Sequence, residues 1–198
     1  MRRMLCLLCL LALLPGCAAA LGRTYADFET LYAENIAFLN QNVQRHLLPH
    51  TPKRDYDTDG KRLYRIVNGA LDVEIHMDQQ SEQIASCRIT LTAPSSMPYG
   101  SPQHLDFSVS GYHSYALLMA MAPGDTPYER YALVQQVSDA LAAGDTFDTY
   151  TWDYHLTCTR EERSVTMLFE NKLLMEKKTE APVETELPSD EEDNALLG

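Results

Sequence analysis

The sequence has few basic residues, and this shortage excludes one broad class of function. The 198 residues include 16 Lys and Arg against 28 Asp and Glu, which gives a formal net charge of −12. A protein that binds nucleic acid needs a basic surface to displace the counterions of the phosphate backbone. We therefore expect no nucleic-acid partner.

Internal apolar segments and catalytic motifs are also missing. The one long apolar run lies at the N-terminus, so we expect no internal segment to span a bilayer. The chain contains no GxSxG, HExxH, P-loop or GxGxxG pattern. We therefore expect no cofactor, although an enzyme with a site assembled from distant residues stays open as an alternative. A chain that is 45% hydrophobic and 22% charged suits one globular domain and excludes collagen, a coiled coil and full disorder.

The N-terminus has the pattern of an export signal. Arg2 and Arg3 precede an apolar stretch over residues 4–14, and small residues follow it. This apolar stretch is too short for a stable transmembrane helix. The residues Leu14-Pro15-Gly16-Cys17 resemble the lipobox of bacterial lipoproteins, with Pro15 where that family usually has Ala or Ser.

This resemblance implies that residues 1–16 are a signal peptide and that Cys17 becomes the mature N-terminus and carries lipid, palmitate included. Residues 17–23 would then be a tether, and Ala18 would direct the protein to the outer membrane of a Gram-negative cell. An acidic domain adds no attraction to an anionic leaflet, so the lipid would be the whole anchor. The competing interpretation is cleavage after Ala18-Ala19-Ala20, which would release a soluble protein.

The spacing of apolar residues predicts the secondary structure of the first half of the exported part. Apolar residues recur at helical spacing over 24–44, behind a capping box formed by Thr24 and Asp27. A polar loop over 46–60 should follow, and the spacing then changes to the alternation of strands over 63–67, 71–77 and 85–92. Asn68-Gly69 predicts a hairpin between the first two strands.

The second half of the exported part shows the same change from helical spacing to the alternation of strands. Helices are predicted over 106–121 and over 127–143, the second with a capping box from Thr126 and a C-terminal Gly144. Strands are predicted over 149–159 and 165–169. In the first of them Tyr150, Trp152 and Tyr154 alternate with polar residues, which favours a core stripe over an aromatic ligand surface.

These elements predict an α+β domain over residues 24–175, in the order α-β-β-β-α-α-β-β. We expect an antiparallel sheet of about five strands with helices packed on one face. Residues 176–198 contain eight acids, two Lys and two Pro, and they predict a disordered acidic tail.

Two cysteines of the predicted domain are a possible disulfide. Cys87 and Cys158 both fall on the inward faces of predicted strands. Export favours oxidation, and a bond would need their Cα atoms within about 7 Å. The alternative is two separate buried thiols. Neither cysteine has a CxxC partner, so redox catalysis and zinc binding are not expected.

The stretch Asp55-Tyr56-Asp57-Thr58-Asp59-Gly60 matches the opening of an EF-hand calcium loop. Position 12 of that loop is Ile66, where a bidentate Glu is needed. Asp55, Asp57 and Asp59 are therefore a weak calcium candidate, and a polar turn is the favoured interpretation. The scattered histidines suggest no metal site either.

The sequence thus favours a lipid-anchored cell-envelope protein that binds another molecule. The expected partners are the membrane, through the N-terminal lipid, and another envelope protein. No catalytic residue can be assigned from these patterns.

Overall fold

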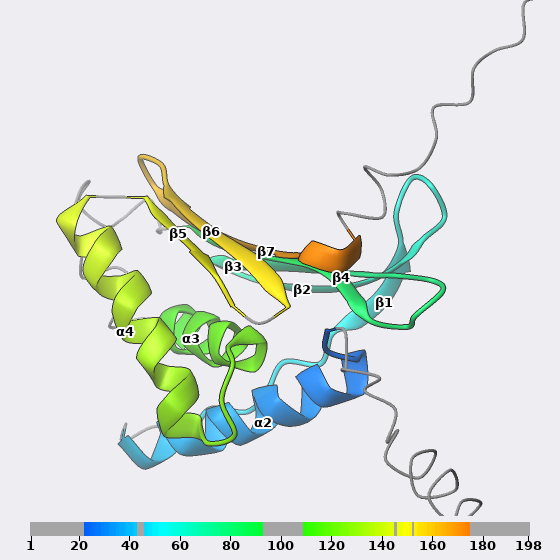
Figure 1. The fold of residues 1–198 in the computed structure, drawn as a ribbon. Coiled ribbons are helices and arrows are strands. Elements are labelled where there is room, and N and C mark those ends of the chain that lie inside the picture. The colour runs from blue at the N-terminus through cyan, green and yellow to red at the C-terminus, as the bar shows by residue number, and fades with distance from the viewer. Residues whose placement is uncertain (1–21, 43–45, 93–108, 145, 152, 175–198) are drawn as a thin grey trace, which may run out of the picture.

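The structure is a computed structural model, and it describes residues 22–42, 46–92, 109–144, 146–151 and 153–174. Within them lie seven strands, all paired antiparallel in the order β1-β2-β3-β4-β7-β6-β5. Figure 1 shows the helices gathered on one face of this sheet. The elements are α2 (Tyr25–Asn42), β1 (Lys53–Tyr56), β2 (Arg62–Asn68), β3 (Leu71–Met77), β4 (Ile84–Thr92), α3 (Val109–Met121), α4 (Pro127–Ala143), β5 (Phe147–Tyr150), β6 (Tyr154–Arg160) and β7 (Ser164–Asn171).

The α+β class and the antiparallel sheet agree with the sequence pattern, but the count of about five strands was wrong. One added strand, β1, lies inside the stretch expected to be a polar loop. It is short and exposed at all four positions, so it carries no apolar alternation that would reveal it.

The second added strand comes from the stretch 149–159, which is not one strand. Strand β5 ends at Tyr150 and β6 begins at Tyr154, and the two strands pair antiparallel with Tyr150 opposite His155. Tyr150 is consequently 65% exposed, whereas Tyr154 is buried. The core-stripe interpretation is therefore wrong for Tyr150 and right for Tyr154; Trp152 lies outside the described residues.

The caps of the helices follow their sequence signals. The Thr24 hydroxyl accepts the backbone N–H of Asp27 at 3.2 Å at the start of α2. At the start of α4, Thr126 and Glu129 form a reciprocal capping box, which satisfies backbone donors that the helix itself cannot pair. Gly144 ends this helix with a φ of 85°, a backbone angle that favours glycine.

The predicted hairpin joins β2 to β3, although its turn differs in detail. Asn68 pairs with Leu71, which leaves Gly69 and Ala70 as the two central residues. Gly69 has a φ of 59°, as the first central position of a type II′ turn requires. On the next hairpin a bulge shifts the register between His76 and Met77, so that Ile84 rather than Ala85 enters the core.

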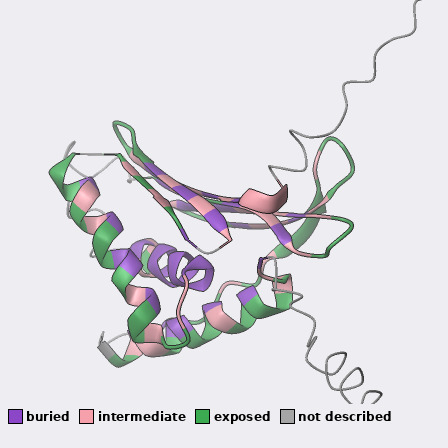
Figure 2. Ribbon diagram, in the orientation of Figure 1, coloured by how far each residue is buried: buried purple, intermediate pink, exposed green. Residues whose placement is uncertain are grey.

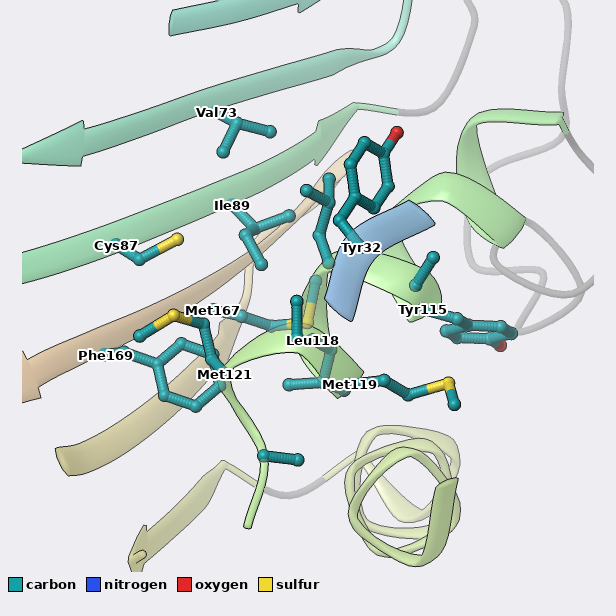
Figure 3. Packing of buried hydrophobic residues seen from close by; sticks show 14 of the residues in the cluster. Tyr32, Val73, Cys87, Ile89, Tyr115, Leu118, Met119, Met121, Met167 and Phe169 are labelled. Atoms are coloured by element: carbon teal, nitrogen blue, oxygen red, sulfur yellow. The ribbon is translucent and has the colours of Figure 1, made fainter. Parts of the chain in front are cut away.

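The core lies between the sheet and the helices. Figure 2 shows the buried residues concentrated there, and α3 is buried along most of its length because it runs between the sheet and the other two helices. Figure 3 shows side chains of the sheet pointing towards those of this helix: Val73, Cys87, Ile89, Met167 and Phe169 on the strands, and Leu118 and Met121 on α3. Among the described helices, none has the length and hydropathy needed to cross a membrane.

Candidate ligand pocket at the start of strand β1

A pocket of about 440 Å³ lies beside the start of β1. Its size falls within the range of small-molecule sites. The pocket exists because β1 pairs with β2 only from Lys53 and Arg65 onward, which leaves residues 66–68 of β2 without a neighbouring strand on that side. Its lining consists of His50, Thr51, Lys53, Asp55, Arg65, Ile66, Val67 and Asn68.

The chain that leads into the pocket is fixed by hydrogen bonds to α2. The side-chain amide of Asn40 pairs with the backbone of Leu47 in both directions, each bond being 2.9 Å long. Leu47 is itself buried against the core. Three residues later, the backbone N–H of His50 donates to the hydroxyl of Tyr32 at 3.3 Å. These contacts hold the His50 ring at the mouth of the pocket.

Behind the pocket lies a pair of stacked histidines. The rings of His50 and His113 stack with centroids 3.9 Å apart. The Tyr32 hydroxyl lies 2.7 Å from Nδ1 of His113 and also accepts the backbone N–H of His50, so it connects the two histidines. The side-chain amide of Asn68 donates to Nε2 of His50 at 3.1 Å.

Burial makes this cluster neutral near pH 7. It lowers the pKa of His113 to about 4, and the neighbouring His50 adds to the effect. Burial also lowers the pKa of His50 and raises the pKa of Tyr32 to about 12. General acid–base catalysis favours a pKa near the working pH. The cluster is therefore suited to supporting a pocket wall and poorly suited to moving protons.

The charges of the pocket lie on the sheet face that the helices leave uncovered. Lys53 and Arg65 are directly opposite each other in the β1–β2 register. The next strand contributes Glu74, whose carboxylate pairs with Arg65 at 3.0 Å and with Arg88 of β4 at 3.3 Å. One carboxylate is thus shared by two guanidinium groups.

The acidic calcium candidate forms a turn. Asp57 accepts the backbone N–H groups of Asp59 at 3.0 Å and of Lys61 at 2.7 Å, which stabilises the β1–β2 hairpin. Asp55 accepts the N–H of Tyr56 at 2.9 Å. Among the residues that the structure describes, no group of three or more His, Cys, Asp or Glu side chains is arranged to hold a metal ion.

Cys87 and Cys158 are free thiols buried on the inner sheet face. They lie on β4 and β6, which are separated by β7. Two strand spacings place the backbones roughly 9–10 Å apart, farther than a disulfide spans. Burial raises the pKa of both thiols to about 12, so neither is a reactive thiolate at neutral pH.

Cys17, the predicted lipidation site, lies outside the described residues. Comparisons with protein-family models, with curated proteins and with solved structures find no match for this chain.

Sequence patterns singled out Asp55 among the lining residues of the pocket, but as a calcium candidate, and they did not indicate the rest of the site. His50 and Lys53 belong to the stretch expected to be a loop, and Tyr32 was part of an apolar helical stripe. One usable signal was His113, the one histidine in α3, a helix without Asp, Glu, Lys or Arg. A histidine buried among apolar residues needs a hydrogen-bond partner, and here Tyr32 supplies it.

Proposed function

We propose that the chain is an exported, lipid-anchored protein of the cell envelope whose domain binds another molecule. Support for the anchor comes from the lipobox-like residues ending at Cys17. Support for binding comes from the preformed pocket beside β1. In a Gram-negative cell the anchor would place the domain on the outer membrane.

The observation that carries the binding half of this proposal is the neutral, fixed state of the side chains behind the pocket. The pKa of His113 near 4 and that of Tyr32 near 12 keep both groups uncharged over the range in which an envelope protein works. Both groups are also held by hydrogen bonds to their own chain. Neither group lines the pocket itself; they support His50, which does, and they do so without exchanging protons with a ligand.

An envelope enzyme is the second candidate function. It is favoured by one feature of the pocket, which is the approach of polar groups from the loop, from β1 and from β2 into one cavity. It would require a titrating group with a pKa near neutrality at that cavity, and burial lowers the pKa of both histidines, that of His113 to about 4. We therefore rank binding first, with another envelope protein or a molecule attached to it as the partner.

The anchor is tested with the Cys17→Ser variant. Cells fed labelled palmitate should incorporate label into the wild-type chain, which should sediment with membranes. The variant should remain unlabelled and either unprocessed or soluble, because the thiol that accepts the lipid is absent. An intact mass showing a wild-type mature chain that starts at Leu21 would contradict the proposal, since it would demonstrate ordinary signal cleavage.

A further inference from the structure

We propose that the pocket beside β1 binds an anionic group, a carboxylate or a phosphate, carried by a small molecule with an apolar part. This inference rests on the binding function proposed above and names the chemistry of the ligand. It is carried by the placement of Lys53 and Arg65 in the sheet, by the shortage of acids that compensate them, and by the apolar wall next to them.

The first step is the position of the two cations. Lys53 and Arg65 are cross-strand partners, so their Cβ atoms are about 4.5–5.5 Å apart on the same sheet face. Like charges placed directly opposite each other destabilise a sheet. An anion bound between the two charges would relieve this repulsion, which explains why such a pair lies at the wall of a pocket.

The second step is that the protein itself does not neutralise the pair. Glu74 is shared by Arg65 and Arg88, so one negative charge serves two positive ones. None of the ion pairs within 4.0 Å in the described part of the chain includes Lys53. The Nε atom of Arg65 is buried and has no hydrogen-bond partner among the described residues, so Glu74 does not saturate this guanidinium.

The third step is the contrast with the rest of the molecule. The whole chain has a formal charge of −12, yet the charged side chains that line the pocket are Lys53, Arg65 and Asp55, with a sum of +1. A locally positive pocket on a strongly acidic protein favours the binding of an anion there. Ammonium and guanidinium groups also make the stronger, charge-assisted hydrogen bonds with carboxylate and phosphate oxygens.

The remaining lining residues indicate the body of the ligand. The apolar surface open to a ligand comes from Val67, which is 70% exposed on an otherwise polar sheet face, whereas the adjacent Ile66 is only 3% exposed and its side chain belongs to the core. The half-buried ring of His50 lies against the same cavity and is held in place by Asn68. An inorganic ion would leave these apolar surfaces uncovered, whereas an aromatic or aliphatic body would contact them.

Asp55 limits the ligand further. It follows Lys53 by two residues, so it lies on the same sheet face and at the same pocket. Its carboxylate repels a bound anion, and it therefore favours ligands of low charge over highly charged ones. Removing this charge should strengthen binding, which gives the proposal a variant with an effect of the opposite sign.

The test is a titration of the full chain with phenyl phosphate, benzoate and benzyl alcohol, followed by NMR of the backbone amides. We expect both anions to shift the signals of residues 50–55 and 65–68, and we expect the neutral alcohol, which has the same ring, to shift them far less. Separate titrations with the two anions show whether phosphate or carboxylate is preferred.

Three substitutions connect the shifts to the pocket. Lys53→Gln should weaken binding about tenfold, because a charge-assisted hydrogen bond is lost and tenfold is the change that such bonds commonly make. Asp55→Asn should strengthen binding by roughly twofold to fivefold, as expected for one nearby screened charge. Arg54→Gln is the matched control: it removes the same charge from the next residue, whose side chain lies on the other sheet face over the ring of Tyr56.

Each remaining outcome overturns the proposal in a distinct way. If Arg54→Gln weakens binding as much as Lys53→Gln, the anion responds to general charge and not to this pocket. If benzyl alcohol binds as well as benzoate, the pocket binds ligands but does not recognise the anion, and the binding function survives. If no probe shifts the signals of residues 50–55 or 65–68, the anion inference fails, while the palmitate label on Cys17 still reports separately on the anchor.

Discussion

Two arginines carry the same charge in opposite settings. Arg130 on α4 is 1% exposed, and four of its five guanidinium N–H groups donate to acceptors of its own chain. Arg65 on β2 has a side chain that is 40% exposed, shares its one carboxylate partner and faces Lys53 across the strand pair. The groups that accept hydrogen bonds from Arg130 are the side chains of Glu34 and Asn35 and the carbonyl oxygens of Gly124 and Asp125.

The difference separates a charge that holds the fold together from a charge that is available to a ligand. Removing a cation from water is costly, and hydrogen bonds must compensate for the lost hydration. Arg130 meets this requirement and in doing so connects α2, α4 and the loop before α4. Arg65 is 40% exposed, so water hydrates part of its guanidinium even though its Nε has no partner among the described residues. Its charge therefore depends less on hydrogen bonds from its own chain.

The largest effect is expected for Arg130→Met. This substitution leaves the buried oxygen of Asn35 and the two backbone carbonyl oxygens without their donor. Its ion-pair partner Glu34 is 47% exposed, so the cost comes mainly from these acceptors, each of which costs about 1–3 kcal/mol of unfolding free energy when left without a donor. Urea denaturation measures it. Arg88→Met is the matched control and should change the unfolding free energy by less than about 1 kcal/mol, because Arg88 is exposed and such surface ion pairs contribute little.

Equal losses of unfolding free energy from Arg130→Met and Arg88→Met would contradict this comparison. They would mean that burial and the number of hydrogen-bond partners do not distinguish a structural arginine from an exposed one in this chain.

An intermediate effect is expected from pH, through the buried histidine beside the pocket. The pKa of His113 is about 4 in the folded protein and about 6.5 when unfolded. Between these values the unfolded chain binds a proton that the folded chain does not, so stability falls as the pH is lowered from about 6.5 to about 4. At 1.36 kcal/mol per pKa unit, the loss from this group approaches about 3 kcal/mol.

His113→Gln should remove most of this pH dependence, because glutamine does not titrate and its carbonyl oxygen can still accept from Tyr32. The unfolding free energy of variant and wild type should be measured at several pH values across the window. His50 contributes a smaller fall of the same sign, since its pKa is also lowered. A variant whose stability falls as steeply as that of the wild type would show that His113 is not the titrating group.

The comparison also shows what the sequence can predict. Capping boxes and the β2–β3 hairpin are local, so the residues that form them are neighbours in the chain and their pattern is readable. The turn between β5 and β6 is not visible in the sequence, because both strands alternate with period two and the alternation continues without a break. The position of this turn decides that Tyr150 is exposed while Tyr154 is buried, and it depends on strand pairing and not on spacing in the sequence.

The pocket could not be predicted for the same reason. Lys53 and Arg65 are 12 positions apart and become neighbours only once β1 pairs with β2. Tyr32 and His113 are 81 positions apart in the sequence. The Arg130 network likewise joins residues 95 and 96 positions apart, and nothing in the spacing of Glu34 and Asn35 indicates their partner.

The smallest effect on stability, and the most direct test of the account, is expected for Lys53→Gln. We infer that Lys53 and Arg65 are placed to bind a ligand, and that their mutual repulsion lowers the stability of the sheet. Removing one of two opposed like charges should therefore leave the unfolding free energy unchanged or raise it by up to about 1 kcal/mol. Urea denaturation and the phenyl phosphate titration should be carried out on the same preparation of this variant. We expect the affinity of this variant for phenyl phosphate to fall while its unfolding free energy is unchanged or higher. A loss of stability, or an affinity equal to that of the wild type, would contradict this inference.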